Sequence, residues 1–305
     1  MEAAEGRGRF IASLPHGSPD LFGGTAGRLR FHLLLWDETG AREQLQYAVE
    51  AGERLVDQAV ERESGALCWR IPEGYGGLSG KSYLGYAHGA AGIADSLLDL
   101  YDATGETRWL ESARGAGRWL SRLATPALDD GSGLSWPSCE GEDPAAPYWC
   151  HGAAGIGSFW LHAARVGLLP EASDFAIRAA MTTARGSRWT GPPLCHGLAG
   201  SIELLLDAYQ QSGDERHLAE GRSLGDLLEA SAIELEGGLL GWCSESAEVV
   251  SPDYNVGYAG VACALLRLAQ PATRPRALGR RGFRFGGSEP DPVPSLPASS
   301  KEAVV

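Results

Sequence analysis

The sequence predicts an all-α protein whose helical hairpins form a ring, and three observations support that fold class. The motif Gly-x-Ala-Gly occurs five times, at intervals of 45 to 65 residues. An apolar run of helical length follows every copy, and where the plan is clearest an amphipathic run comes next. The copies occupy residues 24–27, 89–92, 152–155, 197–200 and 257–260.

The second repeat shows the plan in order. Residues 89–101 are apolar and rich in Ala and Leu, which predicts a helix buried on most sides. The sequence Asp-Ala-Thr-Gly at 102–105 ends it. Residues 106–123 place Trp, Leu and Ala three and four apart with Arg and Glu between them, as in an amphipathic outer helix. A loop rich in Gly, Pro and Ser, 124–147, leads into the next motif.

The fourth repeat follows the same plan. Residues 201–211 are apolar, 212–214 form a break, and 215–235 are amphipathic, so they predict an inner helix followed by an outer one. We expect the motif at the start of each inner helix, where small residues allow close backbone approach and glycine allows a turn with positive φ. All five helix starts then point to one end of the ring, where loops and helix N-termini build a site.

Composition divides the chain into three parts. We expect residues 1–19, which are polar, to be flexible, residues 20–270 to form the ring domain, and residues 271–305 to be a disordered tail rich in Pro, Gly and Arg. Five arginines lie between Arg274 and Arg284. A solvated tail is the expected state, and the alternative is that this Arg cluster binds something acidic, including the chain's own surface.

The charge balance narrows the choice of partners. The formal net charge is −13, from 26 Lys and Arg against 39 Asp and Glu, which disfavours nucleic acid and anionic membranes. No run of 18 apolar residues predicts a membrane span, and residues 1–19 lack the apolar core of a signal peptide. We therefore expect a cytoplasmic protein.

Two of the six cysteines are followed directly by histidine and then by the motif: Cys150-His151 and Cys195-His196. Thiolate and imidazole at matching places in two repeats predict a transition-metal site, best suited to zinc. Four ligands would close the coordination sphere, whereas three would leave a position open for water or substrate. Crowding between adjacent residues favours three, and the alternative to a metal site is packed thiols beside loop histidines.

Two more residues occupy places near the same rim. His88 directly precedes its motif as His151 and His196 do, but Ala87 stands where they have Cys, so we interpret His88 as an acid or base rather than a ligand. Asp20 lies four residues before the first motif and could orient His88 or accept a thiol proton. Equally, His88 could be a structural loop histidine and Asp20 a turn or cap residue.

These residues resemble the LanC-like family, the cyclases that form lanthionine rings in lanthipeptides. The resemblance rests on Gly-rich repeats, on the Trp-Cys-x-Gly loop at 149–152 and on the Cys-His-Gly loop at 195–197, and it runs from Asp20 to about Ala269. It implies an α/α toroid, or barrel. It also implies zinc bound by three residues and two catalytic residues. The implied ligands are Cys150, Cys195 and His196, and the implied catalytic residues are His88 and Asp20.

The resemblance implies addition of a peptide Cys thiol to dehydroalanine or dehydrobutyrine, which forms a thioether. Zinc would deprotonate and hold the thiol, His88 would protonate the resulting enolate carbon, and Asp20 would accept the thiol proton or orient His88. The implied substrate is a dehydrated precursor peptide. A dehydratase, a kinase/lyase partner or fused upstream domains would supply it.

The sequence departs from the family in two respects. Members often have an Arg four residues before the first zinc Cys, where this chain has Ala146. Family toroids usually contain seven hairpins, whereas five motifs occur here, so the first two hairpins are missing and we expect an incomplete ring. Such a ring exposes apolar helix faces at its open edge, which favours association.

Other functions fit parts of the same pattern. A non-catalytic zinc-binding module for a peptide or thiol would keep the metal site without turnover. Another zinc enzyme that alkylates thiols on an α/α barrel, such as a prenyltransferase subunit, would need an Asp ligand and a basic diphosphate pocket. A glycoside-processing barrel would need two placed carboxylates, for which Asp129 and Asp130 are the candidates.

Overall fold

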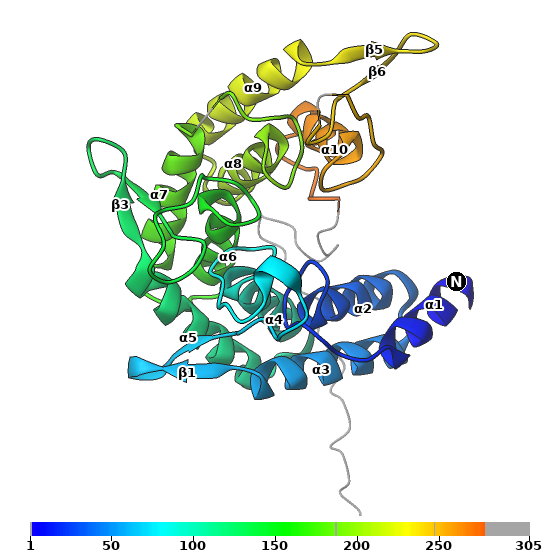
Figure 1. The fold of residues 1–305 in the computed structure, drawn as a ribbon, viewed down its shortest axis with the longest axis vertical. Coiled ribbons are helices and arrows are strands. Elements are labelled where there is room, and N and C mark those ends of the chain that lie inside the picture. The colour runs from blue at the N-terminus through cyan, green and yellow to red at the C-terminus, as the bar shows by residue number, and fades with distance from the viewer. Residues whose placement is uncertain (1, 187, 247, 278–305) are drawn as a thin grey trace, which may run out of the picture.

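The computed structural model describes residues 2–186, 188–246 and 248–277, and over these residues the protein is mainly helical (Figure 1). The described helices follow the repeats of the sequence. They are α1 (Glu2–Ser13), α2 (Thr25–Thr39), α3 (Arg42–Asp57), α4 (Ala90–Thr104), α5 (Thr107–Leu123), α6 (Ala153–Arg165), α7 (Ala172–Ala184), α8 (Leu198–Ser212), α9 (Glu215–Ala230) and α10 (Tyr258–Ala269).

Two concentric walls of helices confirm the predicted arrangement. Each Gly-x-Ala-Gly motif begins an inner helix, and consecutive inner helices pack in the order α2, α4, α6, α8, α10. The outer helices α3, α5, α7 and α9 each pack as a hairpin on the inner helix before them. Burial follows the same division, since α4 and α6 are buried at almost every position whereas α5 buries one face, which includes Trp109, Ala113 and Trp119.

The walls form an arc rather than a closed ring over the described residues. Figure 1 shows α2 at one end of this arc and α10 at the other, with α6 and α7 between them. Every other inner helix has inner neighbours on both sides. The prediction of an incomplete ring is therefore confirmed for the part of the chain that the structure describes.

Three two-stranded antiparallel sheets, which the sequence analysis missed, extend the hairpins in the described residues. Each follows an outer helix: α3, α5 and α9. The strands are β1 (Val60–Arg62) with β2 (Ala66–Cys68), β3 (Thr125–Ala127) with β4 (Gly133–Ser135), and β5 (Ile233–Leu235) with β6 (Leu239–Gly241). The predicted helix 215–235 was therefore too long: α9 ends at Ala230, and Ile233 to Leu235 form a strand.

A tryptophan after each of these sheets ties it to the outer helix. The indole N–H groups of Trp69, Trp136 and Trp242 donate to carbonyl oxygens in the last turns of α3, α5 and α9, at 2.7, 2.9 and 2.7 Å. The last four carbonyls of a helix lack partners within the helix, so each indole satisfies one of them while its ring enters the core.

The glycines of the motif have one of the two roles predicted for them, close backbone approach, and not the other, positive φ. The first glycine of each copy has φ between −112° and −138°, which is extended backbone, so positive φ is not the reason for glycine there. Close approach is the reason. A Cβ on the first glycine Gly152 would lie 1.9 Å from the carbonyl oxygen of Ala146, and one on the last glycine Gly92 would lie 1.9 Å from that of Tyr86. Positive φ occurs instead at helix C-caps such as Gly105 and Gly213.

Both ends of the chain contain structure that the sequence did not indicate. Residues 1–19 contain helix α1, which packs on α2 and α3. These two helices provide packing contacts that a polar segment does not have by itself. At the other end, residues 271–277 are described. Arg276 lies among acidic side chains of the ring interior, which was the less favoured alternative for the Arg cluster. The rest of the predicted tail, 278–305, lies outside the described residues.

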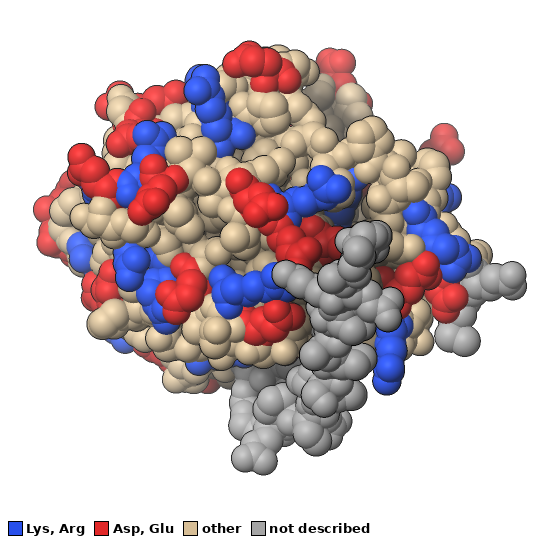
Figure 2. Space-filling model, turned by 90° about the horizontal axis from the view of Figure 1, so that it is seen from below, with Lys and Arg blue, Asp and Glu red and all other residues tan. Residues whose placement is uncertain are grey.

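The surface carries both signs of charge. On the face that Figure 2 shows, acidic and basic side chains lie interspersed. Among the described residues, no helix combines the length and apolar character needed to cross a membrane.

Candidate metal centre

Backbone hydrogen bonds draw the loops before the five motifs together at one end of the ring. The second residue before each of the first four motifs donates its N–H to the carbonyl of its counterpart in the next repeat. Phe22 donates to Ala87 at 3.0 Å, and Ala87 donates to Cys150 at 3.0 Å. Cys150 then donates to the carbonyl of Cys195 at 3.0 Å, and Cys195 to that of Asn255 at 2.8 Å. This ladder fixes the spacing of the loops and places the two cysteines side by side.

A Cys-Cys-His cluster lies on this rim, with a geometry consistent with a metal site. The sulfur atoms of Cys150 and Cys195 and a ring nitrogen of His196 all lie within 4.8 Å of one another. Both cysteines are buried and His196 is partly exposed. Two sulfurs and one nitrogen on fixed loops match the donors that zinc takes, and three protein donors leave one position for a further ligand.

The two thiols already interact strongly. The hydrogen bond from Cys195 lowers the pKa of the Cys150 thiol. The same contact, together with burial, raises the pKa of Cys195. The shared hydrogen bond therefore favours loss of the proton from Cys150 over loss of the proton from Cys195. A divalent cation at this position would replace that proton and stabilise both thiolates, which is the behaviour expected of zinc ligands.

Two neighbours orient His196. Its Nε2 lies 3.0 Å from Oε1 of Glu245, and its ring is 6.2 Å from that of Tyr148, edge to face. A carboxylate on one ring nitrogen of a metal-binding histidine fixes the ring and leaves the other nitrogen for the metal. Glu245 was not identified from the sequence, because it lies outside the motifs.

His88 and Asp20 lie in contact on the same rim. Nδ1 of His88 is 2.6 Å from Oδ2 of Asp20, and the Asp20 side chain is buried. The other oxygen of Asp20 accepts from the backbone N–H of Gly23 at 3.1 Å. Asp20 therefore supports the turn and holds His88 in one orientation, which are two of the three possibilities that the sequence left open.

His151 lies between these two groups but does not belong to the Cys-Cys-His cluster. Its ring centroid is 5.8 Å from that of His88 and 5.5 Å from that of Tyr83. Its Nδ1 is buried and has no hydrogen-bond partner in the structure. Burial and the neighbouring His88 lower the pKa of His151, so the neutral ring is favoured.

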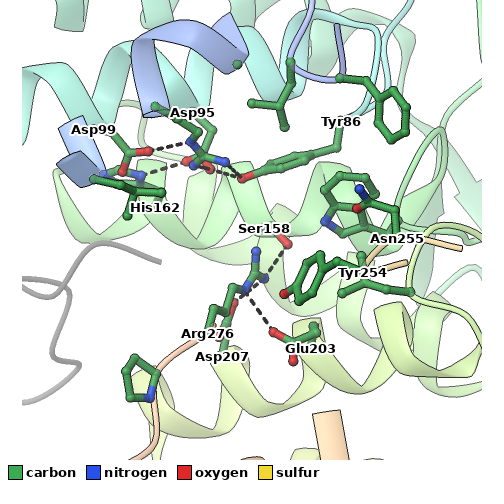
Figure 3. A pocket seen from close by; sticks show the side chains of 18 of the residues that line it. Tyr86, Asp95, Asp99, Ser158, His162, Glu203, Asp207, Tyr254, Asn255 and Arg276 are labelled. Carbon is green, nitrogen blue, oxygen red and sulfur yellow. Dashed lines mark hydrogen bonds and ion pairs between the residues drawn. The ribbon is translucent and has the colours of Figure 1, made fainter. Parts of the chain in front are cut away.

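A cavity of about 370 Å³ lies inside the ring, between the inner helices (Figure 3). The third residue before each motif lines it, and the metal-cluster residues do not. These lining residues are Leu21, Tyr86, Trp149, Leu194 and Tyr254. They divide the rim, with its cysteines and histidines, from the interior of the ring.

The walls of the cavity carry charges that the sequence analysis did not single out. On one side, Arg30 of α2 pairs with Asp95 and Asp99 of α4 at 2.6 Å each, and His162 lies 2.7 Å from Asp95. On the other side, Arg267 of α10 pairs with Glu203 and Asp207 of α8 at 2.6 and 2.7 Å. Each arginine joins neighbouring inner helices.

A positional signal for these residues exists in the sequence. Counted from the last glycine of each motif, the third and seventh residues lie one helical turn apart and therefore on the same face of the inner helix. In the first four repeats both positions line the cavity, and in the fifth repeat they do not. The third residues are Arg30, Asp95, Ser158, Glu203 and Cys263, and the seventh are Leu34, Asp99, His162, Asp207 and Arg267. Charged residues inside otherwise apolar helices mark the lining. By contrast, Asp130 is an exposed loop residue that pairs with Arg185.

Comparison with known proteins places the chain in a family. The family described as "Lanthionine synthetase C-like protein" matches residues 7–278, most of the chain, so the protein belongs to this family. A curated relative from Danio rerio, named "Glutathione S-transferase LANCL1", is 27% identical over 139 residues. That match spans 45% of this chain and 33% of the relative, so the matched part covers about a third of the relative's length.

Solved structures share the fold. Nisin cyclase superposes with a TM-score of 0.57 at 15% identity, over 83% of this chain and 63% of that protein. Cellobiose 2-epimerase from Spirochaeta thermophila DSM 6192 gives 0.55 at 15% identity, over 81% and 70% of the two chains. A family 76 glycoside hydrolase (mannosidase) from Bacteroides thetaiotaomicron gives 0.54 at 12% identity, over 83% and 70%. These likenesses show an α/α toroid and carry no activity with them.

Proposed function

We propose that this protein is a zinc-dependent cyclase that adds a peptide Cys thiol to dehydroalanine or dehydrobutyrine and forms a thioether ring. The observation that supports it most is the Cys150, Cys195 and His196 cluster beside the His88 and Asp20 pair, in a chain of the lanthionine synthetase C-like family. We also propose that it acts in the cytoplasm on a dehydrated precursor peptide. A dehydratase, a kinase/lyase partner or upstream domains would prepare that peptide.

The proposed roles follow from the geometry. Cys150, Cys195 and His196 would hold zinc, which would lower the pKa of the substrate thiol and keep its sulfur near the reacting carbon. Asp20 holds His88 through Nδ1, so Nε2 is the nitrogen that can give a proton to the enolate carbon. The backbone ladder between the loops fixes these groups relative to one another, which supports catalysis by positioning.

The direct test is to incubate zinc-loaded protein with a dehydrated precursor peptide and to count free thiols by alkylation and mass spectrometry. We expect thiols to disappear without a change in peptide mass, because addition of a thiol to an alkene conserves all atoms. Cys195→Ala should abolish both zinc binding and thiol loss, while Cys263→Ala, on α10, should retain both. Unchanged thiols with folded, zinc-loaded protein would refute the cyclase proposal.

A non-catalytic zinc-binding module for a peptide or thiol is the second candidate. Ala146 favours it, since this position often carries Arg in the family. The name of the Danio rerio relative points to glutathione as a thiol probe. Under this alternative, zinc-loaded protein would bind glutathione or the peptide in a Cys195-dependent way and leave the thiol count unchanged.

A further inference from the structure

The ring cavity contains a buried acidic pocket on α8 that is occupied by an arginine of the same chain. Nη2 of Arg276 pairs with Oδ2 of Asp207 and donates to Oγ of Ser158 at 2.8 Å. Its Nε lies 3.6 Å from Oε2 of Glu203 (Figure 3). The side chains of Glu203 and Asp207 are 3% and 7% exposed, so water does not stabilise their charges.

The charges of this pocket favour a second cation. Glu203 and Asp207 carry two negative charges, and Arg267 supplies one positive charge from α10. Without Arg276, one negative charge would remain buried, and an uncompensated buried charge is strongly destabilising. Unless one of these carboxyl groups takes up a proton, Arg276 or another cation is needed to compensate that charge. On the opposite wall, Arg30 and His162 already compensate the carboxylates of α4.

The fit of Arg276 is incomplete. Oε1 of Glu203 is buried and has no hydrogen-bond partner in the structure, and neither has Nε of Arg276. A guanidinium that entered at a slightly different angle could donate to both oxygens of Glu203, as paired donors of arginine commonly do with a carboxylate. The cavity has a volume of about 370 Å³ with Arg276 in place, which leaves room for further atoms of a ligand.

We infer that the pocket formed by Glu203, Asp207 and Ser158 is a binding site for the guanidinium of an arginine-bearing peptide, with Arg276 as its intramolecular competitor. The residues of the metal cluster do not line this cavity, so the site is separate from the candidate metal centre. The inference rests on the proposed function only in taking the ligand to be a peptide.

The test uses two short peptides and no zinc or reactive thiol. Acetyl-Gly-Arg-Gly-amide and its citrulline counterpart, which has the same shape without the charge, are titrated into the full-length chain by calorimetry. We expect Arg276→Ala to bind the arginine peptide at least tenfold more tightly than the wild type, and to bind the citrulline peptide at least tenfold more weakly than the arginine peptide. The matched control Arg274→Ala should behave as the wild type.

Other results would overturn the inference. Equal affinity of Arg276→Ala and wild type for the arginine peptide would show that Arg276 is not a competitor. Equal binding of the citrulline or a lysine peptide would show that the pocket does not select a guanidinium. Because failure of this test leaves the thiol assay unaffected, it is distinguishable from failure of the cyclase proposal.

A second measurement covers the case in which Arg276→Ala does not fold. Trypsin cleaves after Arg276 only when this side chain can leave the pocket, and Pro275 protects the bond after Arg274. In the full-length chain we expect Asp207→Asn to accelerate cleavage after Arg276 at least fivefold, as followed by mass spectrometry. Equal cleavage rates would show that Asp207 does not hold Arg276, and would overturn the inference.

Discussion

Cys195 and His196 are adjacent in the chain, whereas Cys150 comes from a loop 45 residues earlier. The shared position before the motif makes these residues neighbours, because the ladder of backbone hydrogen bonds joins equivalent loop positions. His88 directly precedes its motif, as His151 and His196 precede theirs. It forms a hydrogen bond with Asp20 and does not belong to the Cys-Cys-His cluster. One repeated position therefore carries side chains with different chemistry in different repeats.

Replacing His88 should separate chemistry from metal binding. If His88 donates the proton to carbon, we expect His88→Asn to slow thiol loss about 100-fold or more, which is the usual contribution of a placed acid or base. Zinc content, measured by atomic absorption, should stay unchanged because His88 does not belong to the cluster. A variant with the wild-type rate would rule out this role.

Glu245 should tune the affinity of the site for zinc. With His196 no longer fixed through Nε2, we expect Glu245→Gln to weaken zinc binding about 10- to 100-fold, as seen when outer partners of metal ligands are removed. Competition with a chelator measures this change. Glu248→Gln alters an exposed residue nearby and should leave the affinity unchanged, and a similar effect of both variants would contradict the assignment.

The inner helix with its motif is the repeating element of the fold. Its second glycine packs against the carbonyl of the loop that precedes it, so the loop folds back over the helix start. In three of the described repeats, a carbonyl in the last turn of the outer helix accepts a hydrogen bond from a tryptophan. The third repeat has no such sheet among its described residues, which accounts for the short interval between Gly152 and Gly197.

Two glycine variants should distinguish close packing from backbone conformation. In Gly92→Ala, the new Cβ would meet the carbonyl oxygen of Tyr86 at 1.9 Å, so the loop has to move, at a cost of about 3 kcal/mol or more. Gly23→Ala meets no atom within 4 Å and should change the free energy of unfolding by less than about 0.5 kcal/mol. Chemical denaturation compares the two, and equal stabilities would contradict the packing argument.

The tryptophan after each sheet should stabilise the fold through its N–H as well as through its ring. Trp136→Phe keeps an aromatic ring in the core but leaves the carbonyl of Leu120 without its donor. We therefore expect a loss of about 1–3 kcal/mol in unfolding free energy. Trp189→Phe is the matched control, because Trp189 is 96% exposed, and it should be nearly neutral. Thermal or chemical unfolding measures both, and equal effects would show that the bond from Trp136 is unimportant.

Across the whole molecule, two arginines that pair with buried carboxylates link neighbouring inner helices. Arg30 connects α2 to α4, and Arg267 connects α10 to α8, so the two ends of the arc are each attached by ion pairs. Membership of the lanthionine synthetase C-like family is consistent with the architecture that this chain shares with nisin cyclase. The charged residues of the cavity follow the motifs along the inner helices and face the interior of the arc.

Breaking one of these links should destabilise the whole arc. We expect Arg30→Gln to cost about 3–5 kcal/mol, because Asp95 and Asp99 would remain as buried carboxylates with fewer partners. The control Arg108→Gln breaks exposed pairs and should cost less than about 1 kcal/mol. Urea unfolding at neutral pH measures both free energies, and comparable losses would contradict the proposed link.

The stabilities of the wild type and Arg30→Gln should depend differently on pH. Burial by itself would raise the pKa of Asp95, but Arg30 and His162 lower it below its ordinary value of 3.8. A carboxylate with a lowered pKa in the folded state stabilises the protein above pH 3.8, and this contribution disappears as the pH falls through the folded-state pKa. The stability advantage of wild type over Arg30→Gln should therefore shrink below about pH 4, and a constant difference would contradict it.

The sequence predicted the hairpin plan, the rim and the Cys and His residues brought together there, because periodicity and repeated position are local properties of the chain. It placed α9 several residues too long, because a β-branched residue such as Ile233 fits an amphipathic helix or a strand equally well until the strands pair. It predicted both close approach and positive φ for the motif glycines, and only close approach is found, since sequence shows that glycine is needed but not whether space or conformation requires it.

By itself, the sequence determined the fold class, the number of motifs and the end of the ring where the chemically active side chains gather. Only the tertiary structure decided that His88 meets Asp20, that Glu245 meets His196, and that Arg276 enters the acidic pocket of α8. The physical reason is that helical periodicity depends on neighbours along the chain. An ion pair or hydrogen bond between repeats depends on distances that exist only once all the hairpins have packed.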